Sequence, residues 1–454
     1  MNNTYLGKDV KRYDGLDHIA GATKYVDDIT VPHTLMVKVL RSPVAKGELI
    51  RINTTAAEQL PGVAAVITHV DVPHPLDDDP ILAKSIRYKG QPIAAVAAID
   101  EQTAVKAVKL IETSIEEQTA VFDPIEAMRA DSPKVRPEGN VFRFEKRDCR
   151  RIVFGDVKKG FKEADVILEE NYLHPPIEHA PMEPNTCLVV PEANGRLNVY
   201  TMSQGAHVTL QALFRILQAE PNSPICEKWA PRHRNRGITH LNDINCASGF
   251  CGGAFGGKAE LHAEPIAAIL ALITGQPVKW RWTREEDLLY SVYRGSWHIR
   301  IKDGIMKDGR IVAREIRSIR EAGAYVGQNP YATEKHSFLA AGPYFIPNVL
   351  IEGYCVFTNK PKAGGMRGFG ITPSTFATEV QMDRIAHTLG IDPWRLRFIN
   401  AYRDGEMTPT RRIVDSVYLI ETLQALARKA GITLSEDLME MRSILPRETE
   451  GMKQ

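Results

Sequence analysis

A glycine-dense segment at residues 249–258 reads Gly-Phe-Cys-Gly-Gly-Ala-Phe-Gly-Gly-Lys. Glycine lets several backbone N–H groups turn toward one point, which suits an anion or an oxygen-rich cofactor. Several chemistries use such loops, and a turn that only lets two elements pack closely explains this segment equally well. The segment therefore marks a candidate binding site without identifying its ligand.

Two nucleotide-binding patterns are tested first. Residues 252–258 satisfy the first seven positions of Gly-x-x-x-x-Gly-Lys-[Ser/Thr], but the eighth is Ala259, which has no hydroxyl for Mg²⁺. The spacing of Gly249 and Gly252 does not fit Gly-x-Gly-x-x-Gly. The polar residues 242–248 do not read as a buried strand, so no strand is expected before the loop. An NTPase and a dinucleotide-binding protein are both disfavoured.

A second glycine cluster, residues 364–370, reads Gly-Gly-Met-Arg-Gly-Phe-Gly. It offers the guanidinium of Arg367 to an oxyanion and the ring of Phe369 to a planar ligand. Taken alone, Arg367 fits a buried ion pair and Phe369 fits the core. Gln204 comes after an expected strand at 197–201, and together the three features favour a shared site.

The elements that must position these residues are read from periodicity and capping signals. The pattern predicts a compact α+β region, a proline- and charge-rich connection over 123–151, and a longer alternation of strands and helices from 153 onward. The expected strands are 34–41, 63–69, 92–99, 197–201, 278–282 and 311–319. The expected helices are 54–60, 100–111, 263–273, 375–389 and 415–431. At 454 residues the chain suggests two or three domains.

The composition limits the classes of partner that this chain can bind. The 57 Lys and Arg residues balance 56 Asp and Glu residues, which disfavours nucleic acid and an anionic membrane as partners. Arg232, Arg234 and Arg236 are interpreted as a solvated loop. The apolar run 266–273 is too short to span a membrane, and no signal peptide is apparent, so a soluble cytoplasmic protein is expected. The spacing of the six cysteines fits neither zinc nor iron–sulfur ligation, which places any iron–sulfur centre on another chain.

In its motifs the chain resembles the molybdenum-binding subunit of the xanthine dehydrogenase/aldehyde oxidase family. The segments that carry the resemblance follow in family order over most of the chain: 21–28, 40–43, 90–96, 179–184, 253–258, 366–370 with Glu379 and Asp383, and 389–397 with Asn400. The resemblance implies an α+β fold. An α/β hammerhead domain would occupy 1–122, a linker 123–151, and the first half of a molybdopterin-binding domain 152–454.

The resemblance also implies an activity, which is hydroxylation of an N-heteroaromatic or aldehyde substrate with oxygen from water. Molybdenum bound to molybdopterin, in bacteria usually as the cytosine dinucleotide, would receive two electrons. These would pass through [2Fe-2S] clusters to FAD, with the clusters and the flavin on partner subunits.

The family motifs carry site roles over to matching positions here. The implied cofactor-binding residues are Gln204, Gly253, Ala254, Phe255, Gly256, Gly257, Arg367 and Gly368. Among these, Gln204, Phe255 and Arg367 would lie beside the metal. Phe369 would stack on the substrate, and Lys335 would stabilise charge developing on it, although a surface lysine explains Lys335 equally well. Ala259 stands where purine-hydroxylating members carry Glu, which argues against an ordinary purine substrate.

Two departures from the family pattern matter. The general-base glutamate lies in a Gly-x-Gly-Glu segment near the far end of the family's subunit, and this chain has no such segment. No catalytic residue is therefore assigned here. A second molybdopterin half-subunit is expected to supply the glutamate, as in split members such as nicotinate dehydrogenase. The competing hypothesis is a truncated, non-catalytic remnant.

The second departure is residues 220–248, which match the family poorly. An insertion and a reading-frame slip both explain this stretch, and it places the folding of the following loop in doubt.

Overall fold

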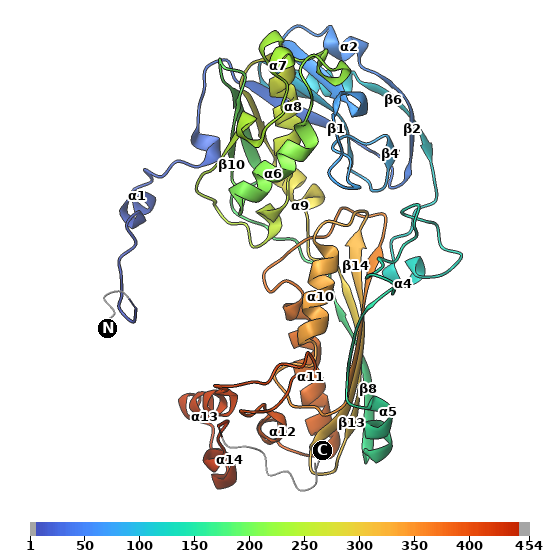
Figure 1. Cartoon of the computed structure of the whole chain (residues 1–454), viewed down its shortest axis with the longest axis vertical. Helices are drawn as coiled ribbons and strands as arrows, with labels where there is room; N and C mark the ends of the chain where they lie inside the picture. The colour runs from blue at the N-terminus through green and yellow to red at the C-terminus, as the bar shows by residue number, and fades with distance from the viewer. Residues whose placement is uncertain (1–5, 445–454) are drawn as a thin grey trace. The chain divides into compact units, whose positions relative to one another are not determined.

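The computed structural model of the chain describes residues 6–444. Its contacts divide the chain into two compact units, each built from two separate segments (Figure 1). The first unit comprises Met1–Gln118 and His179–Ser291, and the second comprises Thr119–Glu178 and Val292–Gln454. The candidate loop at 249–258 belongs to the first unit and the loop at 364–370 to the second.

The first unit is built on a seven-stranded mixed sheet in the order β11-β10-β9-β12-β1-β5-β3, beside a smaller sheet β4-β2-β6. Its strands are β1 (Leu35–Arg41), β2 (Gly47–Asn53), β3 (Val63–Thr68), β4 (Ser85–Ile86), β5 (Pro92–Ala98), β6 (Glu112–Glu117), β9 (Thr186–Pro191), β10 (Leu197–Thr201), β11 (Ile244–Ser248) and β12 (Val278–Arg281). Its helices are α1 (Gly15–Ile19), α2 (Thr55–Glu58), α3 (Glu101–Lys109), α6 (Ala206–Leu217), α7 (Pro231–Arg236), α8 (Glu264–Thr274) and α9 (Arg284–Tyr290). Short 3₁₀ turns are η1 (Val26–Asp28), η2 (His69–Asp71), η3 (Pro224–Cys226), η4 (Leu241–Asp243) and η5 (Gly257–Ala259).

Helix α8 forms the centre of the first unit's core. Its residues are apolar on all sides, which is the pattern of a fully buried helix, and its residues from Glu264 to Leu272 are buried. Pro265 lies in the first turn, where its missing N–H costs no hydrogen bond, and Gly275 ends the helix at φ 66°. The helix packs against β9, β12 and β3, so it anchors the loop that precedes it.

A strand does precede the glycine loop, contrary to the expectation from the sequence. Strand β11 pairs in parallel with β10 through all five of its residues, from Ile244 to Ser248. It is an edge strand of the sheet, and only Ile244 is buried. An edge strand tolerates polar side chains, which explains why 242–248 lacked the signal of a buried strand.

The poorly matching stretch 220–248 is ordered and packs into the first unit. Trp229 is buried in the main core cluster, and the buried carboxylate of Asp243 forms an ion pair with Arg236. The arginine-rich segment is helix α7, which corrects the expectation of a solvated loop. The loop that follows β11 is thus supported by a folded segment.

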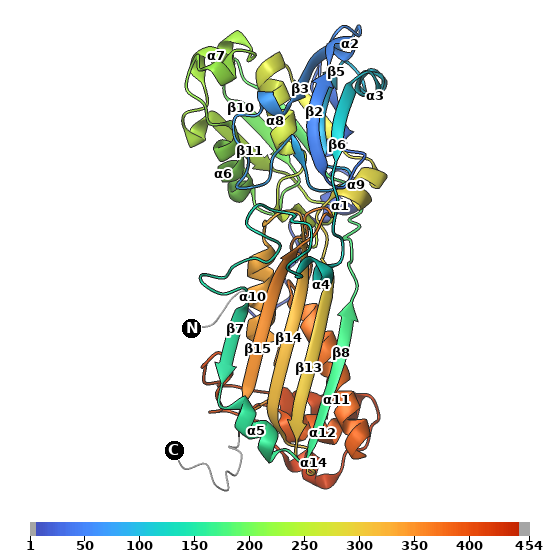
Figure 2. The same cartoon turned by 90° about the vertical axis from the view of Figure 1, so that its right-hand side faces the viewer.

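The second unit contains a five-stranded sheet in the order β7-β15-β14-β13-β8 (Figure 2). Helices α10 and α11 cover one face of this sheet (Figures 1 and 2). Its strands are β7 (Arg150–Phe154), β8 (Val166–His174), β13 (Trp297–Ile305), β14 (Ile311–Gly323) and β15 (Val349–Phe357). Its helices are α4 (Pro124–Ala127), α5 (Val157–Glu163), α10 (Asn329–Leu339), α11 (Ile371–Leu389), α12 (Pro393–Asn400), α13 (Leu419–Lys429) and α14 (Glu436–Glu440).

A fully buried ion pair lies between the sheet and α11. Arg314 donates from Nε and Nη2 to the carboxylate of Asp303 at 2.7 and 3.0 Å, and both side chains are 0% exposed. Gln381 of α11 donates to the same carboxylate at 3.0 Å. Because each polar group is satisfied, the pair fixes α11 on the sheet without leaving a buried charge uncompensated.

The strands expected from periodicity are confirmed within one or two residues at most ends, although β14 continues to Gly323. The helix expected at 415–431 begins later, at Leu419. The α+β fold class is confirmed. No helix within residues 6–444 is long and apolar enough to cross a membrane.

Candidate functional site

In the first unit, Gln204 and the glycine loop leave neighbouring strands of the sheet. Strands β10 and β11 run parallel, and their last residues, Thr201 and Ser248, are paired in register. The Ser248 hydroxyl donates to the carbonyl of Ser203 at 2.8 Å, which ties the two chain segments together. Ligands of such sheets bind beyond the carboxyl ends of parallel strands, and both of these chain segments leave the sheet at those ends.

The loop backbone adopts conformations that ordinary side chains rarely tolerate. Phe255 has φ 55°, and the glycines at 253 and 256 each have φ 105°. A Cβ at Gly252 would lie 2.7 Å from Cβ of Glu183, and one at Gly257 would lie 3.1 Å from the ring of His179. A side chain at 252 would clash with Glu183 and one at 257 would crowd the ring of His179. Phe255 is held in a strained conformation of the kind often found at functional sites.

Gln204 is bonded to the loop at two points. The N–H of Gly256 donates to Oε1 of Gln204 at 3.0 Å, and the N–H of Gln204 donates to the carbonyl of Lys258 at 2.9 Å. A backbone N–H can only donate, so the Gln204 atom that faces it must be the carbonyl oxygen. The side-chain NH₂ group, a pure donor, is therefore the end of Gln204 directed away from Gly256.

A buried ion pair stabilises this loop. Lys258 is 1% exposed and its Nζ lies 2.8 Å from Oε2 of Glu183. The same carboxylate oxygen accepts the N–H of Gly252 at 2.8 Å. Glu183 therefore binds both ends of the turn 252–258 at once.

In the second unit, two buried arginines hold the backbone of the loop at 364–370. Arg294 donates to the carbonyl of Arg367. Arg320 donates to the carbonyl of Gly364 at 2.9 Å and to that of Asn329 at 2.7 Å. The side chain of Arg367 itself is exposed. These hydrogen bonds hold the backbone of the loop, while the guanidinium of Arg367 faces solvent.

Phe369 lies against helix α10. Its φ is 42°, and its ring centroid is 5.2 Å from that of Tyr331, whose ring in turn carries the ammonium of Lys335 at 5.3 Å. A Cβ at Gly365 would lie 2.8 Å from the Phe369 ring. Glycine at 365 thus leaves room for the ring, and Tyr331 links Phe369 to Lys335.

His336, also on α10, anchors the end of the second loop. Its Nδ1 lies 3.0 Å from the carbonyl of Gly370 and its Nε2 lies 2.7 Å from the hydroxyl of Ser318. Its ring stacks on Trp297 at 4.2 Å between centroids. Burial lowers the pKa of His336 from its ordinary value of 6.5 to about 4, so the neutral ring supports the loop at physiological pH.

This depressed pKa makes the stability of the second unit depend on pH. Between pH 6.5 and 4 an unfolded chain binds a proton at this histidine that the folded chain excludes. The contribution of His336 to the unfolding free energy is therefore present above pH 6.5 and is lost as the pH falls toward 4. We expect His336→Gln to reduce the loss in unfolding free energy between pH 7 and pH 5 by about 2 kcal/mol. Urea titrations at both pH values measure it, with the exposed His387→Gln as control. An unchanged pH dependence in His336→Gln would contradict the assignment.

The sequence-predicted residues form two groups, one in each unit. Gln204 is bonded directly to the loop that contains Gly253, Ala254, Phe255, Gly256 and Gly257, and Ala259 ends the 3₁₀ turn that follows that loop. Arg367, Gly368 and Phe369 share the second loop, and Tyr331 connects Phe369 to Lys335.

Sequence reasoning missed the supports of both loops. Glu183, Arg294, Arg320, Tyr331 and His336 were not singled out. Glu183 lies in the segment 179–184 that carried part of the resemblance, but nothing in its spacing identifies a partner 75 residues away. Arg294 lies in the turn before β13, Arg320 on β14, and Tyr331 and His336 on α10. Nothing in the local periodicity of these segments indicates their long-range contacts.

The exposed groups at the two loops are hydrogen-bond donors. The Gln204 NH₂ group and the Arg367 guanidinium both suit phosphate oxygens and an oxygen bound to a metal. Strained, glycine-rich backbone allows close approach of a large cofactor. The residues of each loop therefore fit an anionic, oxygen-rich group such as molybdopterin.

Two family models match the chain. The "Aldehyde oxidase and xanthine dehydrogenase, a/b hammerhead domain" matches residues 20–119, and the "Molybdopterin cofactor-binding domain" matches residues 138–228 and 237–401. The interval between the last two ranges, 229–236, contains helix α7 and lies within the stretch that departs from the family pattern.

Individual relatives agree with these models. The chain is 35% identical to a probable xanthine dehydrogenase subunit of Bacillus subtilis over 92% of this chain and 54% of that protein. It is 29% identical to "Nicotinate dehydrogenase large molybdopterin subunit" of Eubacterium barkeri over 94% of this chain and 96% of that protein. The structure of aldehyde oxidoreductase from Desulfovibrio gigas superimposes with a TM-score of 0.83 at 27% identity, over 92% of this chain and 46% of that one. The chain thus spans about half the length of the first relative and nearly all of the second.

Proposed function

Because the chain belongs to the xanthine dehydrogenase/aldehyde oxidase family of molybdenum hydroxylases, we propose that it is a molybdopterin-binding half-subunit of such an enzyme. The complete enzyme would hydroxylate an N-heteroaromatic or aldehyde substrate with oxygen from water. The observation that carries the proposal is the bonding of Gln204 to Gly256, which directs an amide donor away from a strained glycine loop at the end of two parallel strands.

We assign the first loop to the cofactor. Gln204 would donate a hydrogen bond to an oxygen ligand of the metal, and Phe255 would present its backbone beside the metal. Gly253, Ala254, Gly256 and Gly257 would follow the pterin closely, because their backbone has no bulky side chains in the way. Molybdenum, when bound through the pterin, would supply the two-electron redox chemistry.

We assign two roles to the second loop. Arg367 and Gly368 would bind cofactor oxygens, since the carbonyl of Arg367 is fixed by Arg294 while its guanidinium stays exposed. Phe369 would stack on a planar substrate ring, and Lys335 would offset negative charge that develops on it. Ala259 leaves space where a purine-hydroxylating relative would place a carboxylate.

The relatives support a proposal for the partner subunits. The similarity to the Eubacterium barkeri large subunit extends over nearly the full length of both chains, which supports a second molybdopterin half-subunit that supplies the general-base glutamate. We further propose an iron–sulfur subunit, an FAD subunit and the cytosine dinucleotide form of the cofactor. Within this chain, the hammerhead domain would occupy 1–122, the connection 123–151 and the molybdopterin-binding region 152–454. A cytoplasmic location remains a prediction.

The test is an isotope experiment on the chain purified with its co-expressed partner subunits. We expect N-heteroaromatic or aldehyde substrates to give a hydroxylated product that carries ¹⁸O from H₂¹⁸O, with reduction of an artificial electron acceptor. Absence of turnover across both substrate classes in a fully assembled complex that contains the cofactor would favour the non-catalytic remnant.

A further inference from the structure

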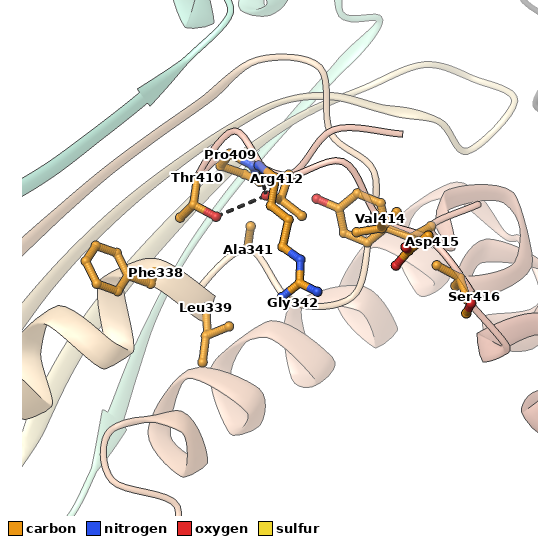
Figure 3. Close-up of a pocket in the computed structure, with 13 residues that line it drawn as sticks. Phe338, Leu339, Ala341, Gly342, Pro409, Thr410, Arg412, Val414, Asp415 and Ser416 are labelled. Carbon is orange, nitrogen blue, oxygen red and sulfur yellow. Dashed lines mark hydrogen bonds between the residues drawn. The ribbon is translucent and has the colours of Figure 1, made fainter. Parts of the chain in front are cut away.

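A cavity outside both loops has the features of a small-molecule site. It has a volume of about 630 Å³ and lies within the second unit, between the end of α10 and the loop 403–417 (Figure 3). This volume falls in the range of ligand pockets in proteins. None of the residues assigned to the cofactor or substrate lines it.

The wall formed by the loop 403–417 is pre-formed by its own hydrogen bonds. The N–H of Thr408 donates to the carbonyl of Arg412 at 2.8 Å, and the N–H of Arg412 donates back to the Thr408 hydroxyl at 3.1 Å. The N–H of Gly405 donates to the carbonyl of Val414 at 2.9 Å, nearer the two ends of the same loop. A loop closed in this way holds its side chains in place before any ligand arrives, which lowers the entropic cost of binding.

The opposite wall is apolar. Phe338 and Leu339 end helix α10, and Leu339 is 47% exposed although it is a large aliphatic residue. Gly342 completes this side, where a Cβ would lie 2.9 Å from Thr378. The wall offers a hydrophobic surface to the body of a ligand.

Two polar side chains of residues that line the cavity have no partner in the described part of the chain. Tyr402 is only 7% exposed, and its buried hydroxyl makes no hydrogen bond. Leaving a buried hydroxyl unpaired is unfavourable, so a ligand acceptor that reaches this hydroxyl would remove that penalty. Arg412 is exposed and makes no ion pair among residues 6–444, and its side chain lines the cavity (Figure 3).

We propose that this cavity binds a small organic monocarboxylate. The carboxylate would pair with Arg412 and accept a hydrogen bond from Tyr402, while the hydrophobic body would pack on Phe338 and Leu339. Asp415 also lines the cavity and repels negative charge, so a ligand with one negative charge is repelled less than a phosphate or a dicarboxylate. The site is independent of the proposed molybdenum chemistry, because it shares no residue with it.

The test uses benzoate as the probe and benzamide as its neutral isostere, with the chain purified together with its co-expressed partners. We expect saturable benzoate binding by calorimetry, weaker binding of benzamide, and a loss of about tenfold or more in benzoate affinity for Arg412→Gln. Arg428→Gln, an exposed change on α13 outside the cavity, should leave the affinity unaltered.

Tyr402→Phe gives a second, distinct signature. It removes an unpaired buried hydroxyl, so the melting temperature should stay the same or rise while benzoate affinity falls several-fold. Non-saturable benzoate binding, equal affinity for benzamide, or unchanged affinity in both Arg412→Gln and Tyr402→Phe would overturn the proposal. A cavity filled by a partner chain would show itself as the first of these outcomes.

Discussion

Replacing Glu183 by alanine is expected to destabilise the first unit by about 3–5 kcal/mol and to abolish retention of molybdenum. The substitution leaves the ammonium of Lys258 buried at 1% exposure without a counter-charge, and it removes the acceptor of the Gly252 N–H. Because Gln204 is bonded to the carbonyl of Lys258, movement of this lysine would also displace the amide donor. Denaturant unfolding and metal analysis of the purified complex measure the two effects.

A double variant separates the effect of charge from that of packing, and a single exposed variant serves as the control. The double variant Glu183→Leu with Lys258→Met removes both charges, and we expect it to recover most of the lost stability, since apolar replacements of a buried pair are often neutral. Its molybdenum content should stay low, because the Gly252 N–H still lacks its acceptor. Glu220→Ala, at an exposed position in the same unit, is the matched control. A Glu183→Ala protein that is as stable as the parent would contradict the role given to the pair.

Replacing Arg367 by alanine is expected to have the opposite profile. The side chain is exposed and the backbone of its loop is held by Arg294 and Arg320, so the stability should change by no more than about 0.5 kcal/mol. Molybdenum occupancy or turnover should nonetheless fall at least about tenfold, because a charge-assisted contact to the cofactor is lost. Arg428→Ala on α13 removes an exposed arginine from the same unit and serves as the control. Unchanged occupancy and unchanged turnover in Arg367→Ala would remove this residue from the site.

The elements that could be predicted are those whose signals are local. Asp100 caps α3 by accepting the N–H of Thr103 at 2.7 Å, and Gly390 ends α11 at φ 64°, both as their residue types indicate. Strands with continuous apolar runs, such as β5, were equally evident. In each case the residues that specify the element lie within it.

The features that could not be predicted depend on distant contacts. Strand β11 is polar because it lies at a sheet edge, and only its pairing with β10 makes it a strand. Helix α7 forms in an arginine-rich segment. Its Arg236 forms an ion pair with Asp243, and the neighbouring Trp229 packs into the main core cluster. The pair Glu183–Lys258 joins residues 75 positions apart in the chain. The glycine loops could be located from sequence, but the groups that hold their backbones could not.

The central proposal, that this chain binds molybdopterin, is tested most directly by the composition of the assembled protein. The chain should be purified with its co-expressed partner subunits, and its molybdenum and released pterin should be quantified against polypeptide. The proposal predicts both in amounts close to that of this chain, with loss of both in Glu183→Ala and retention of both in Glu220→Ala. A correctly assembled complex that contains neither molybdenum nor pterin would contradict it.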